Sequence, residues 1–258
     1  ASDLEQLRPT FLKSGQLLST RFDLLPTAYT DALSRLQDRV ELVPVSEIRT
    51  VIEEELGARV RDLFATFDDV PVASASLGQV HRATTVTGRD VVVKVLRPGV
   101  REIVRDDMDL LGQVAELVDT RTSAGPRLGT TRLLAQFRRS LADELDYRKE
   151  WANLARFRDL AADEELLLVP EPLAAFSTSR VLTMDYVPGK KVTDVGPLGL
   201  LDIDGPALSE SLFRFMLTTL LSEGLLHADP HPGNLLVTPD GRIAILDLGM
   251  VARLPRRV

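Results

Sequence analysis

The stretch LLHADPHPGNLLVTPDGRIAILDLGM, residues 225–250, decides how this sequence is interpreted. Its first half places His227, Asp229 and Asn234 in the spacing H-x-D-x-x-x-x-N. This is the spacing of a kinase catalytic loop, in which the aspartate accepts the proton of an attacking hydroxyl group and the asparagine binds a metal ion. The pattern therefore makes Asp229 a candidate catalytic base and Asn234 a candidate metal ligand.

The second half of the stretch ends in Asp247-Leu-Gly, directly after the apolar run IAIL. An aspartate at this place is typical of the carboxylate that holds Mg²⁺ on the phosphates of ATP. The residues between the two motifs are predicted to form a β-hairpin that turns on residues 239–241, because Pro, Asp and Gly favour tight turns. Such a hairpin would keep Asp229 and Asp247 close in space, where metal ions and donors can offset the charge of a phosphoryl group.

Two other interpretations of the stretch stay open from the residues alone. Polar turn residues can form a loop without chemistry, with Asp247 as a helix cap. Alternating His and Asp can also bind zinc or manganese, so His227, Asp229 and His231 are candidate ligands of a metallohydrolase site. His81 is the only other histidine in the sequence. The hairpin and the second Asp motif favour phosphoryl transfer over both alternatives.

The composition is that of a globular protein, because 44% of the 258 residues are apolar and 27% are charged. The net charge of -7 argues against nucleic acid as a partner, since binding a phosphate backbone needs a basic surface. The sequence has no cysteine, which excludes disulfides, thiolate metal sites and a cysteine nucleophile. We find no signal peptide and no apolar run long enough to span a bilayer.

The order of the predicted elements indicates an α+β fold. Residues 1–57 are predicted to be helical, and the last of these helices is expected to be capped by Ser46 and ended by Gly57. The later elements are, in order, a strand, a turn at 87–89, a valine-rich strand, helices over 99–120 and from Thr130 past Arg158, a strand ending at 188–189, an apolar helix over 208–224 and the hairpin.

Lys94 lies in the middle of the valine-rich strand, in the run VVVKVLRPG. A lone lysine there is costly unless it is paired, and its position matches the lysine that holds the α- and β-phosphates of ATP. The run VLTMDYVPG resembles a kinase hinge, with Met184 as gatekeeper and backbone groups of Asp185 and Val187 facing adenine.

Two features differ from an ordinary protein kinase. The sequence has no G-x-G, so the usual loop that covers the phosphates is missing. Ala73, Ser74, Ala75 and Ser76 stand at that place, and this loop should be stiffer than a glycine loop because alanine does not adopt positive φ cheaply. The N-terminal KSGQ, residues 13–16, has no counterpart in kinase chemistry.

These departures are themselves informative. Five motifs occur in order: KSGQ, the alanine-rich loop with GQVHRA, ELDYRKEWAN over residues 144–153, HADPHPGN, and DLG. Together they resemble the UbiB family of atypical, protein-kinase-like proteins, whose members include the ADCK proteins linked to ubiquinone synthesis. The resemblance covers nearly the whole chain.

The resemblance implies a bilobal, kinase-like α+β fold. We expect a helical N-terminal extension over residues 1–57, an N-lobe over 58–187 with the alanine-rich loop and inserted helices, and part of a C-lobe over 188–258. The chain is expected to end before the later helices of that lobe.

The resemblance also implies roles for individual residues. Glu150 would be the helix partner of Lys94. Lys13 and Gln16 would lie on an extension folded over the active site, with Lys13 paired to Glu144. Asp146 would complete the same E-x-D element. A continuous helix from Glu144 to Glu150 would separate these two carboxylates by about 9 Å.

The implied activity is binding of ATP or ADP with Mg²⁺, and ATP hydrolysis or phosphotransfer in quinone or isoprenoid-lipid metabolism. The expected partners are nucleotide, a lipid or quinone precursor and a membrane surface, with the chain on the cytoplasmic side as a peripheral protein or anchored by segments outside it. Two alternatives stay open: a small-molecule or protein kinase with ordinary phosphotransfer, and a nucleotide-regulated pseudokinase scaffold. The oligomeric state is open too, homo-oligomers included.

Overall fold

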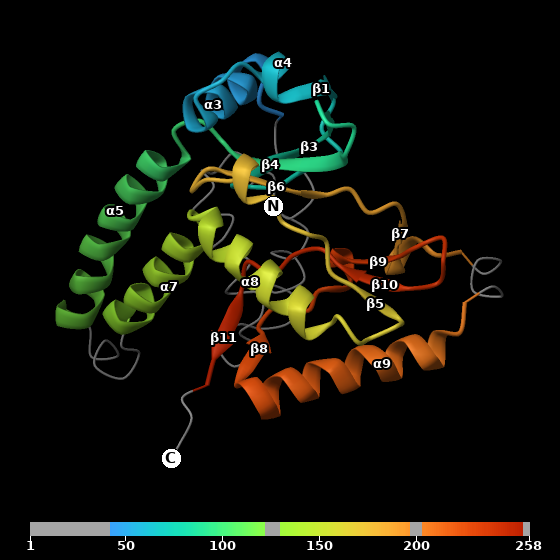
Figure 1. Cartoon of the computed structure of the whole chain (residues 1–258). Helices are drawn as coiled ribbons and strands as arrows, with labels where there is room; N and C mark the ends of the chain where they lie inside the picture. The colour runs from blue at the N-terminus through green and yellow to red at the C-terminus, as the bar shows by residue number, and fades with distance from the viewer. Residues whose placement is uncertain (1–41, 122–129, 197–202, 255–258) are drawn as a thin grey trace.

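A computed structural model describes residues 42–121, 130–196 and 203–254 of the chain. The predicted extension with Lys13 and Gln16 lies outside these residues. The described part combines helices with two main sheets, one above and one below a central helix (Figure 1). The predicted α+β class is confirmed.

The upper sheet is antiparallel, in the order β1-β3-β4-β6 with β2 paired to β3. Its strands are β1 (Phe64–Phe67), β2 (Ala73–Ser74), β3 (Gly78–Thr85), β4 (Asp90–Leu96) and β6 (Val181–Asp185). Gly88 adopts a φ of 84° in the turn between β3 and β4, so the hairpin predicted around residues 87–89 is confirmed.

Helix α3 (Val45–Leu56) packs on one face of the upper sheet. Its Ile48 and Ile52 are fully buried in a core that also contains the inward-facing valines of β4: Val91, Val93 and Val95. The alternation of a strand explains the pattern, because the side chains between these valines face the opposite side of the sheet.

The ends of α3 test two predictions. The helix ends at Gly57, whose φ of 70° is the left-handed conformation expected there. The predicted cap at Ser46 is wrong, because the amides of Glu47 and Ile48 already donate to the carbonyl of Pro44. The helix therefore begins before Ser46.

Three helices follow β4: α5 (Val100–Arg121), α7 (Thr130–Glu144) and α8 (Tyr147–Leu160). The first two lie side by side, and α8 runs between the two sheets (Figure 1). The prediction of one helix from Thr130 past Arg158 is wrong, because the chain leaves the helical path at Asp146, where φ is −129° and ψ is 92°. Glu144 and Glu150 thus belong to different helices, and the separation expected along one helix does not apply.

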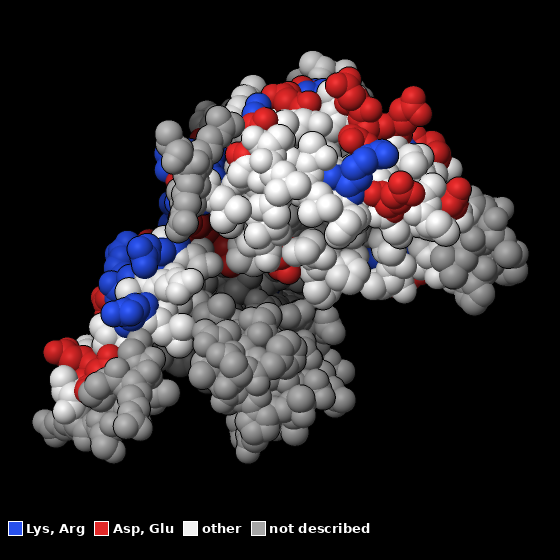
Figure 2. Space-filling view, turned by 90° about the horizontal axis from the view of Figure 1, so that it is seen from below, with Lys and Arg blue, Asp and Glu red and all other residues white. Residues whose placement is uncertain are grey.

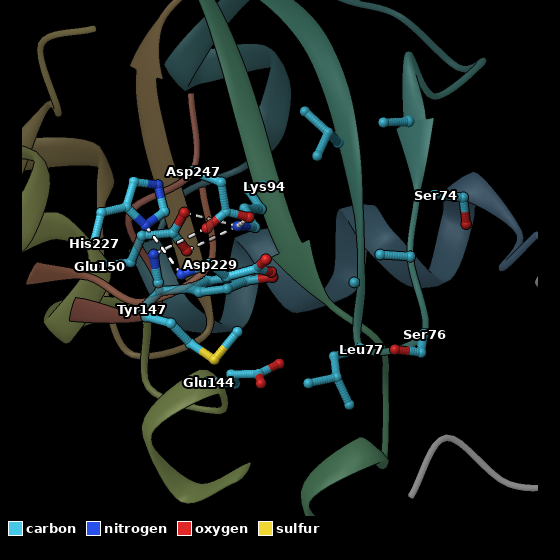
Figure 3. Close-up of a pocket in the computed structure, with 16 residues that line it drawn as sticks. Ser74, Ser76, Leu77, Lys94, Glu144, Tyr147, Glu150, His227, Asp229 and Asp247 are labelled. Carbon is cyan, nitrogen blue, oxygen red and sulfur yellow. Dashed lines mark hydrogen bonds and ion pairs between the residues drawn. The ribbon is translucent and has the colours of Figure 1, made fainter. Parts of the chain in front are cut away.

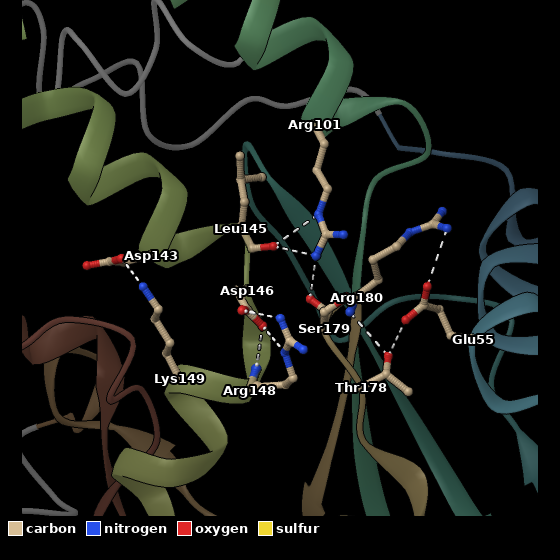
Figure 4. Close-up of polar contacts among 10 residues, drawn as sticks. All are labelled: Glu55, Arg101, Asp143, Leu145, Asp146, Arg148, Lys149, Thr178, Ser179 and Arg180. Carbon is tan, nitrogen blue, oxygen red and sulfur yellow. Dashed lines mark hydrogen bonds and ion pairs between the residues drawn. The ribbon is translucent and has the colours of Figure 1, made fainter. Parts of the chain in front are cut away.

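Hydrogen bonds from distant parts of the chain hold this break in place (Figure 4). The Arg101 guanidinium donates to the carbonyl oxygens of Leu145 and Ser179. The backbone N–H of Tyr147 also donates to Ser179, at 3.1 Å. The carboxylate of Asp146 caps the new helix by accepting from the N–H of Arg148.

The lower part contains a sheet in the order β5-β10-β9-β7, a two-stranded sheet of β8 and β11, and helix α9 (Gly205–Thr218) with a π-helical turn over Thr219–Glu223. The strands are β5 (Leu167–Leu168), β7 (Lys190–Lys191), β8 (Leu225–His227), β9 (Leu235–Val237), β10 (Ile243–Ile245) and β11 (Val251–Arg253). Short helical turns complete the fold at α4 (Val60–Leu63), Ala174–Phe176, Val192–Asp194 and Pro232–Asn234.

The second predicted hairpin is also confirmed, since β9 and β10 pair antiparallel and Gly241 in the turn has a φ of 81°. Strand β5 pairs in parallel with β10, so the lower sheet takes one strand from the range predicted for the N-lobe.

One core connects both sheets through α8. Leu154 and Phe157 of α8 are fully buried, and the ring of Phe157 lies 6.1 Å from that of Phe215 in α9. Asn153 Nδ2 donates to the carbonyl of Leu248 at 2.8 Å, which ties α8 to the Asp-Leu-Gly motif. Helix α8 is therefore fixed against both halves of the chain.

The charge on the surface is mixed. In the view from below, Lys and Arg side chains cluster on the left with some Asp and Glu below them, Asp and Glu predominate along the upper right with some Lys or Arg among them, and an uncharged area lies between (Figure 2). Among the described residues, no helix is both long and apolar enough to cross a membrane.

Candidate active site

A cavity of about 180 Å³ lies where the upper sheet, α8 and the motifs of residues 225–250 meet (Figure 3). The hairpin of β2 and β3 covers it, through residues 73–78. Lys94 of β4 lines one side, and Tyr147 and Glu150 of α8 line another. The remaining lining residues come from the end of α7, from β3 and from the two motifs: Glu144, Val80, His227, Asp229, Asp247, Gly249 and Met250.

Lys94 is held in this cavity by two carboxylates. Its Nζ donates to both oxygens of Glu150 at 2.8 Å and lies 3.5 Å from Oδ2 of Asp247. The side chain of Glu150 is only 5% exposed, so its charge is compensated mainly by the lysine. The structure thus contains the Lys94–Glu150 pair that the family resemblance implies.

The charges of this cluster shift the proton affinities of its members. Burial alone would lower the pKa of Lys94, but the charges of Asp247 and Glu150 outweigh it and hold the pKa well above its ordinary value. Burial raises the pKa of Glu150 to about 7, against the opposing effect of Lys94. Two carboxylates thus lie against one ammonium group in the cavity.

Backbone pairing on both sides brings the catalytic-loop motif beside Asp247. Strand β8 pairs with β11, and Ala228 N–H donates to the carbonyl of Met250 at 2.9 Å. The N–H of Leu246 donates to the carbonyl of Asn234 at 3.0 Å. The hairpin makes neighbours of Asn234 and the residue before Asp247, and Asp229 and Asp247 line the same cavity, as the sequence predicted.

The donors at this place suit Mg²⁺. The Asp247 side chain is 40% exposed, so it is accessible to a cation, and its Oδ1 accepts from the N–H of Gly249 at 2.9 Å. Asn234 can supply an amide oxygen, although it does not line the cavity. Carboxylate and amide oxygens, completed by water and phosphate, form the ligand set that Mg²⁺ prefers.

The metallohydrolase alternative is wrong for the described residues. They contain no group of three His, Cys, Asp or Glu side chains able to hold a metal. His227 Nδ1 accepts from the N–H of Asp229 at 3.3 Å, and His231 Nδ1 accepts from that of Gly233 at 3.0 Å. The Nδ1 atom of each histidine is thus engaged by the local backbone.

The alanine-rich segment is a tight hairpin. Ala75 N–H donates to the carbonyl of Gly78 at 2.8 Å, and only glycines adopt positive φ in the described part of the chain. Arg97 anchors this hairpin: its Nε donates to the carbonyl of Ala75, and its guanidinium also donates to Ser74 Oγ, each at 3.0 Å. The hairpin that covers the cavity is therefore held in place by hydrogen bonds from the Arg97 side chain as well as by the pairing of β2 with β3.

The predicted hinge residues lie apart from the cavity lining. The carboxylate of Asp185 accepts from Arg89 at 2.6 Å, and the N–H of Asp185 donates to the carbonyl of Glu171 at 3.0 Å. That N–H is thus engaged within the protein. Contact of adenine with the Asp185 carbonyl and with Val187 stays a prediction.

The two E-x-D residues have different places. Glu144 lines the cavity (Figure 3), whereas Asp146 is not among the lining residues and forms an ion pair with Arg148 at 2.7 Å (Figure 4). The pairing of Lys13 with Glu144 lies outside the described residues, as does Gln16.

Sequence reasoning missed one cavity residue, Tyr147, as a functional candidate, and it considered His227 only as part of the catalytic-loop motif and as a metallohydrolase ligand. Both are buried, with 4% of their surface exposed. Burial lowers the pKa of His227. A signal for Tyr147 was present, because it lies three residues before Glu150 and thus on the same helix face.

The lysine of β4 is held by a glutamate of α8, and the lower motifs present Asp247 to the same lysine. Protein kinases hold the phosphates of ATP with this arrangement, so the fold and the cavity define a protein-kinase-like chain. Residues 35–258 match the ABC1 atypical kinase-like domain. The chain belongs to this family, and the resemblance to UbiB and ADCK proteins is confirmed.

Among curated relatives, the chain is 41% identical to Protein ACTIVITY OF BC1 COMPLEX KINASE 8, chloroplastic, of Arabidopsis thaliana, covering 95% of this chain and 33% of the relative. It is 38% identical to Probable protein kinase UbiB of Marinobacter nauticus, covering 97% and 47%. The chain thus spans less than half the length of these relatives.

A solved structure with a similar fold is the complex of Rv3197 with erythromycin from Mycobacterium tuberculosis. Its TM-score is 0.68 at 32% identity, and the match covers 93% of this chain and 60% of that one.

Proposed function

We propose that this chain binds ATP with Mg²⁺ in the cavity beside Lys94 and transfers or hydrolyses the terminal phosphate in support of quinone or isoprenoid-lipid biosynthesis at a membrane. One observation carries the proposal: Lys94 Nζ lies between Glu150 and Asp247, at 2.8 and 3.5 Å, in a cavity covered by the β2–β3 hairpin. The lipid part rests on the family resemblance.

Each residue has a distinct part in this proposal. Lys94 binds the α- and β-phosphates, and Glu150 keeps its ammonium oriented toward them. Asp247 and Asn234 hold Mg²⁺, which supplies positive charge against the phosphate oxygens. Asp229 accepts the proton of the attacking hydroxyl group or water, as its place in the catalytic-loop motif suggests.

The anchored hairpin favours a small acceptor over a protein substrate. Ordinary kinases cover the phosphates with a flexible glycine loop. Here the cover is a β-turn held by Arg97, so we expect it to open less readily.

Calorimetry with ADP and ATP, with and without Mg²⁺, tests the proposal. Wild type should bind in a Mg²⁺-dependent manner, and binding should be lost in Lys94→Ala and in Asp247→Asn. The matched controls are Lys190→Ala and Asp240→Asn, whose side chains lie outside the cavity and should leave binding unchanged. Equal binding in all five proteins would overturn the nucleotide site.

The membrane and lipid part needs its own test. ATP hydrolysis should rise when vesicles that contain a prenylated phenol are added to wild type. Vesicles without the phenol show how much of the increase is due to the membrane surface alone. If neither kind of vesicle changes the rate of ATP hydrolysis, the proposed role at a membrane is overturned and the nucleotide site still stands.

A second candidate is ordinary phosphotransfer to a protein, favoured by the bacterial relatives named as probable protein kinases. The test is to add a general protein substrate such as casein. If labelled phosphate is transferred to casein as fast as ATP is consumed, ordinary protein phosphorylation is favoured over the role in lipid biosynthesis.

A further inference from the structure

Tyr147 is one of two buried polar rings in the cavity, with His227, and has no part in the function proposed above. It begins α8, one turn before Glu150, with 4% of its surface exposed. Its ring reaches from α8 into the cavity below Lys94 (Figure 3), and the ring centre lies 5.3 Å from the lysine Nζ. No described residue forms a hydrogen bond with its hydroxyl group.

The opposite wall of the cavity packs closely against this hydroxyl group. Gly78, at the start of β3, has no side chain at this point, and a Cβ atom there would lie 2.5 Å from the Tyr147 hydroxyl oxygen and 2.6 Å from the carbonyl oxygen of Val95. Glycine is therefore needed for this close approach of Tyr147, which lines the cavity, to the backbone of β3.

The chemistry of the hydroxyl group limits what it can bind. Burial raises the pKa of Tyr147 far above neutral pH, so the phenol stays protonated and can donate. The nearest cation, Lys94, has no acceptor to offer. Carboxylates of Glu144, Glu150 and Asp247 also line the cavity, so this O–H donor and the ammonium suit an anionic oxygen acceptor that binds together with a cation.

The covering hairpin strengthens this conclusion. In ordinary kinases a glycine-rich loop covers the phosphates. Here the N–H of Ala75 is already bonded to Gly78 within the turn, at 2.8 Å. This amide is therefore not available to a phosphate, whereas the ring of Tyr147 lines the same cavity.

We propose that the Tyr147 hydroxyl group donates a hydrogen bond to a phosphate oxygen of the bound nucleotide, in place of an amide of a glycine-rich loop. The inference rests on the proposed nucleotide site and adds a residue that binds the polyphosphate.

Tyr147→Phe tests the inference, because it keeps the ring against Lys94 and Gly78 and removes only the hydroxyl group. The affinities of ATP, ADP and adenosine are measured by calorimetry for wild type and variant. A hydrogen bond to a charged group is worth about 1.5–3 kcal/mol, so we expect at least a roughly tenfold loss for ATP and ADP. Adenosine should bind both proteins equally. The matched control is Tyr186→Phe, whose ring packs under Arg82 at 4.1 Å and should change none of the affinities.

The results separate the two levels of the argument. If wild type binds ATP and ADP and Tyr147→Phe binds them equally well, the inference is overturned and the nucleotide site stands. An equal loss for adenosine would also overturn it, because the effect would not lie at the phosphates. If wild type binds no nucleotide, both the site and the inference are overturned. The unfolding temperatures of wild type and Tyr147→Phe are measured in parallel and should match. A match shows that a change in affinity does not come from misfolding, which would also abolish adenosine binding.

Discussion

Lys94 and Asp247 lie 3.5 Å apart, Nζ to Oδ2, although 153 positions separate them in the chain. Lys94 also donates to both oxygens of Glu150 at 2.8 Å. The strand of the upper sheet, the central helix and the Asp-Leu-Gly motif therefore meet at one ammonium group. Any change to one carboxylate alters how firmly the lysine is held by the other.

Glu150→Gln should weaken Mg²⁺ binding. Without the charge of Glu150, the ammonium of Lys94 pairs with Asp247 alone, and that carboxylate then has to release it to accept a cation. A charge-assisted bond is worth about 1.5–3 kcal/mol, so the Mg²⁺ concentration that gives half-maximal ADP binding should rise on the order of tenfold. Titration of Mg²⁺ at fixed ADP measures it. Glu171→Gln, which alters an ion pair with Arg89 outside the cavity, is the control. The same Mg²⁺ dependence in wild type and Glu150→Gln would contradict this competition.

Local turn chemistry explains which parts of the fold were predictable. Gly88 and Gly241 both adopt positive φ in two-strand hairpins, and glycine marks such turns in the sequence itself. Asp247 and Asn234 were found in the same way, because their motifs are contiguous. The hairpin between the motifs then determines their distance.

The break before α8 depends on tertiary contacts, and the sequence ELDYRKE contains no helix breaker that would reveal it. The guanidinium of Arg101 and the carbonyl of Ser179, both distant in the chain, satisfy the backbone there. Tyr147 was missed for a related reason. The place of its hydroxyl group depends on the missing side chain of Gly78, across the cavity, against whose backbone it packs.

Gly78→Ala should destabilise the protein by about 1–3 kcal/mol, the usual cost of overpacking. The new Cβ would lie 2.6 Å from the backbone oxygen of Val95, which cannot move without distorting β4. Urea unfolding measures the loss. Gly112→Ala is the matched control: Gly112 lies inside α5 with open space around it, so alanine there should stabilise by roughly 0.5–1 kcal/mol. If Gly78→Ala has the same free energy of unfolding as wild type, β3 does not need the close approach of Gly78 to Val95.

Ala75→Gly should increase autophosphorylation. Glycine at the turn gains access to conformations that alanine avoids, so the hairpin should open more often although Arg97 still binds its carbonyl oxygen. Incorporation of labelled phosphate should rise several-fold over wild type. Ala174→Gly, in a short helical turn outside the cavity, controls for a general effect of glycine. An unaltered labelling rate would count against a stiff cover.

His81 should make the stability of the upper sheet depend on pH. Its ring is fully buried, its Nδ1 lies 2.9 Å from the carbonyl oxygen of Asp68, and burial lowers its pKa below 6.5. Two of the charges around it, Asp68 and Asp69, oppose this shift, while Arg49 adds to it. The unfolded chain therefore binds a proton more readily, so the contribution of His81 is complete above pH 6.5 and is lost as the pH falls through that value toward the folded pKa. Urea midpoints between pH 5 and pH 8 should decline more steeply toward acid for wild type than for His81→Gln, whose side chain does not titrate. Parallel curves for the two proteins would mean that His81 is not the group responsible, whatever the difference in absolute stability.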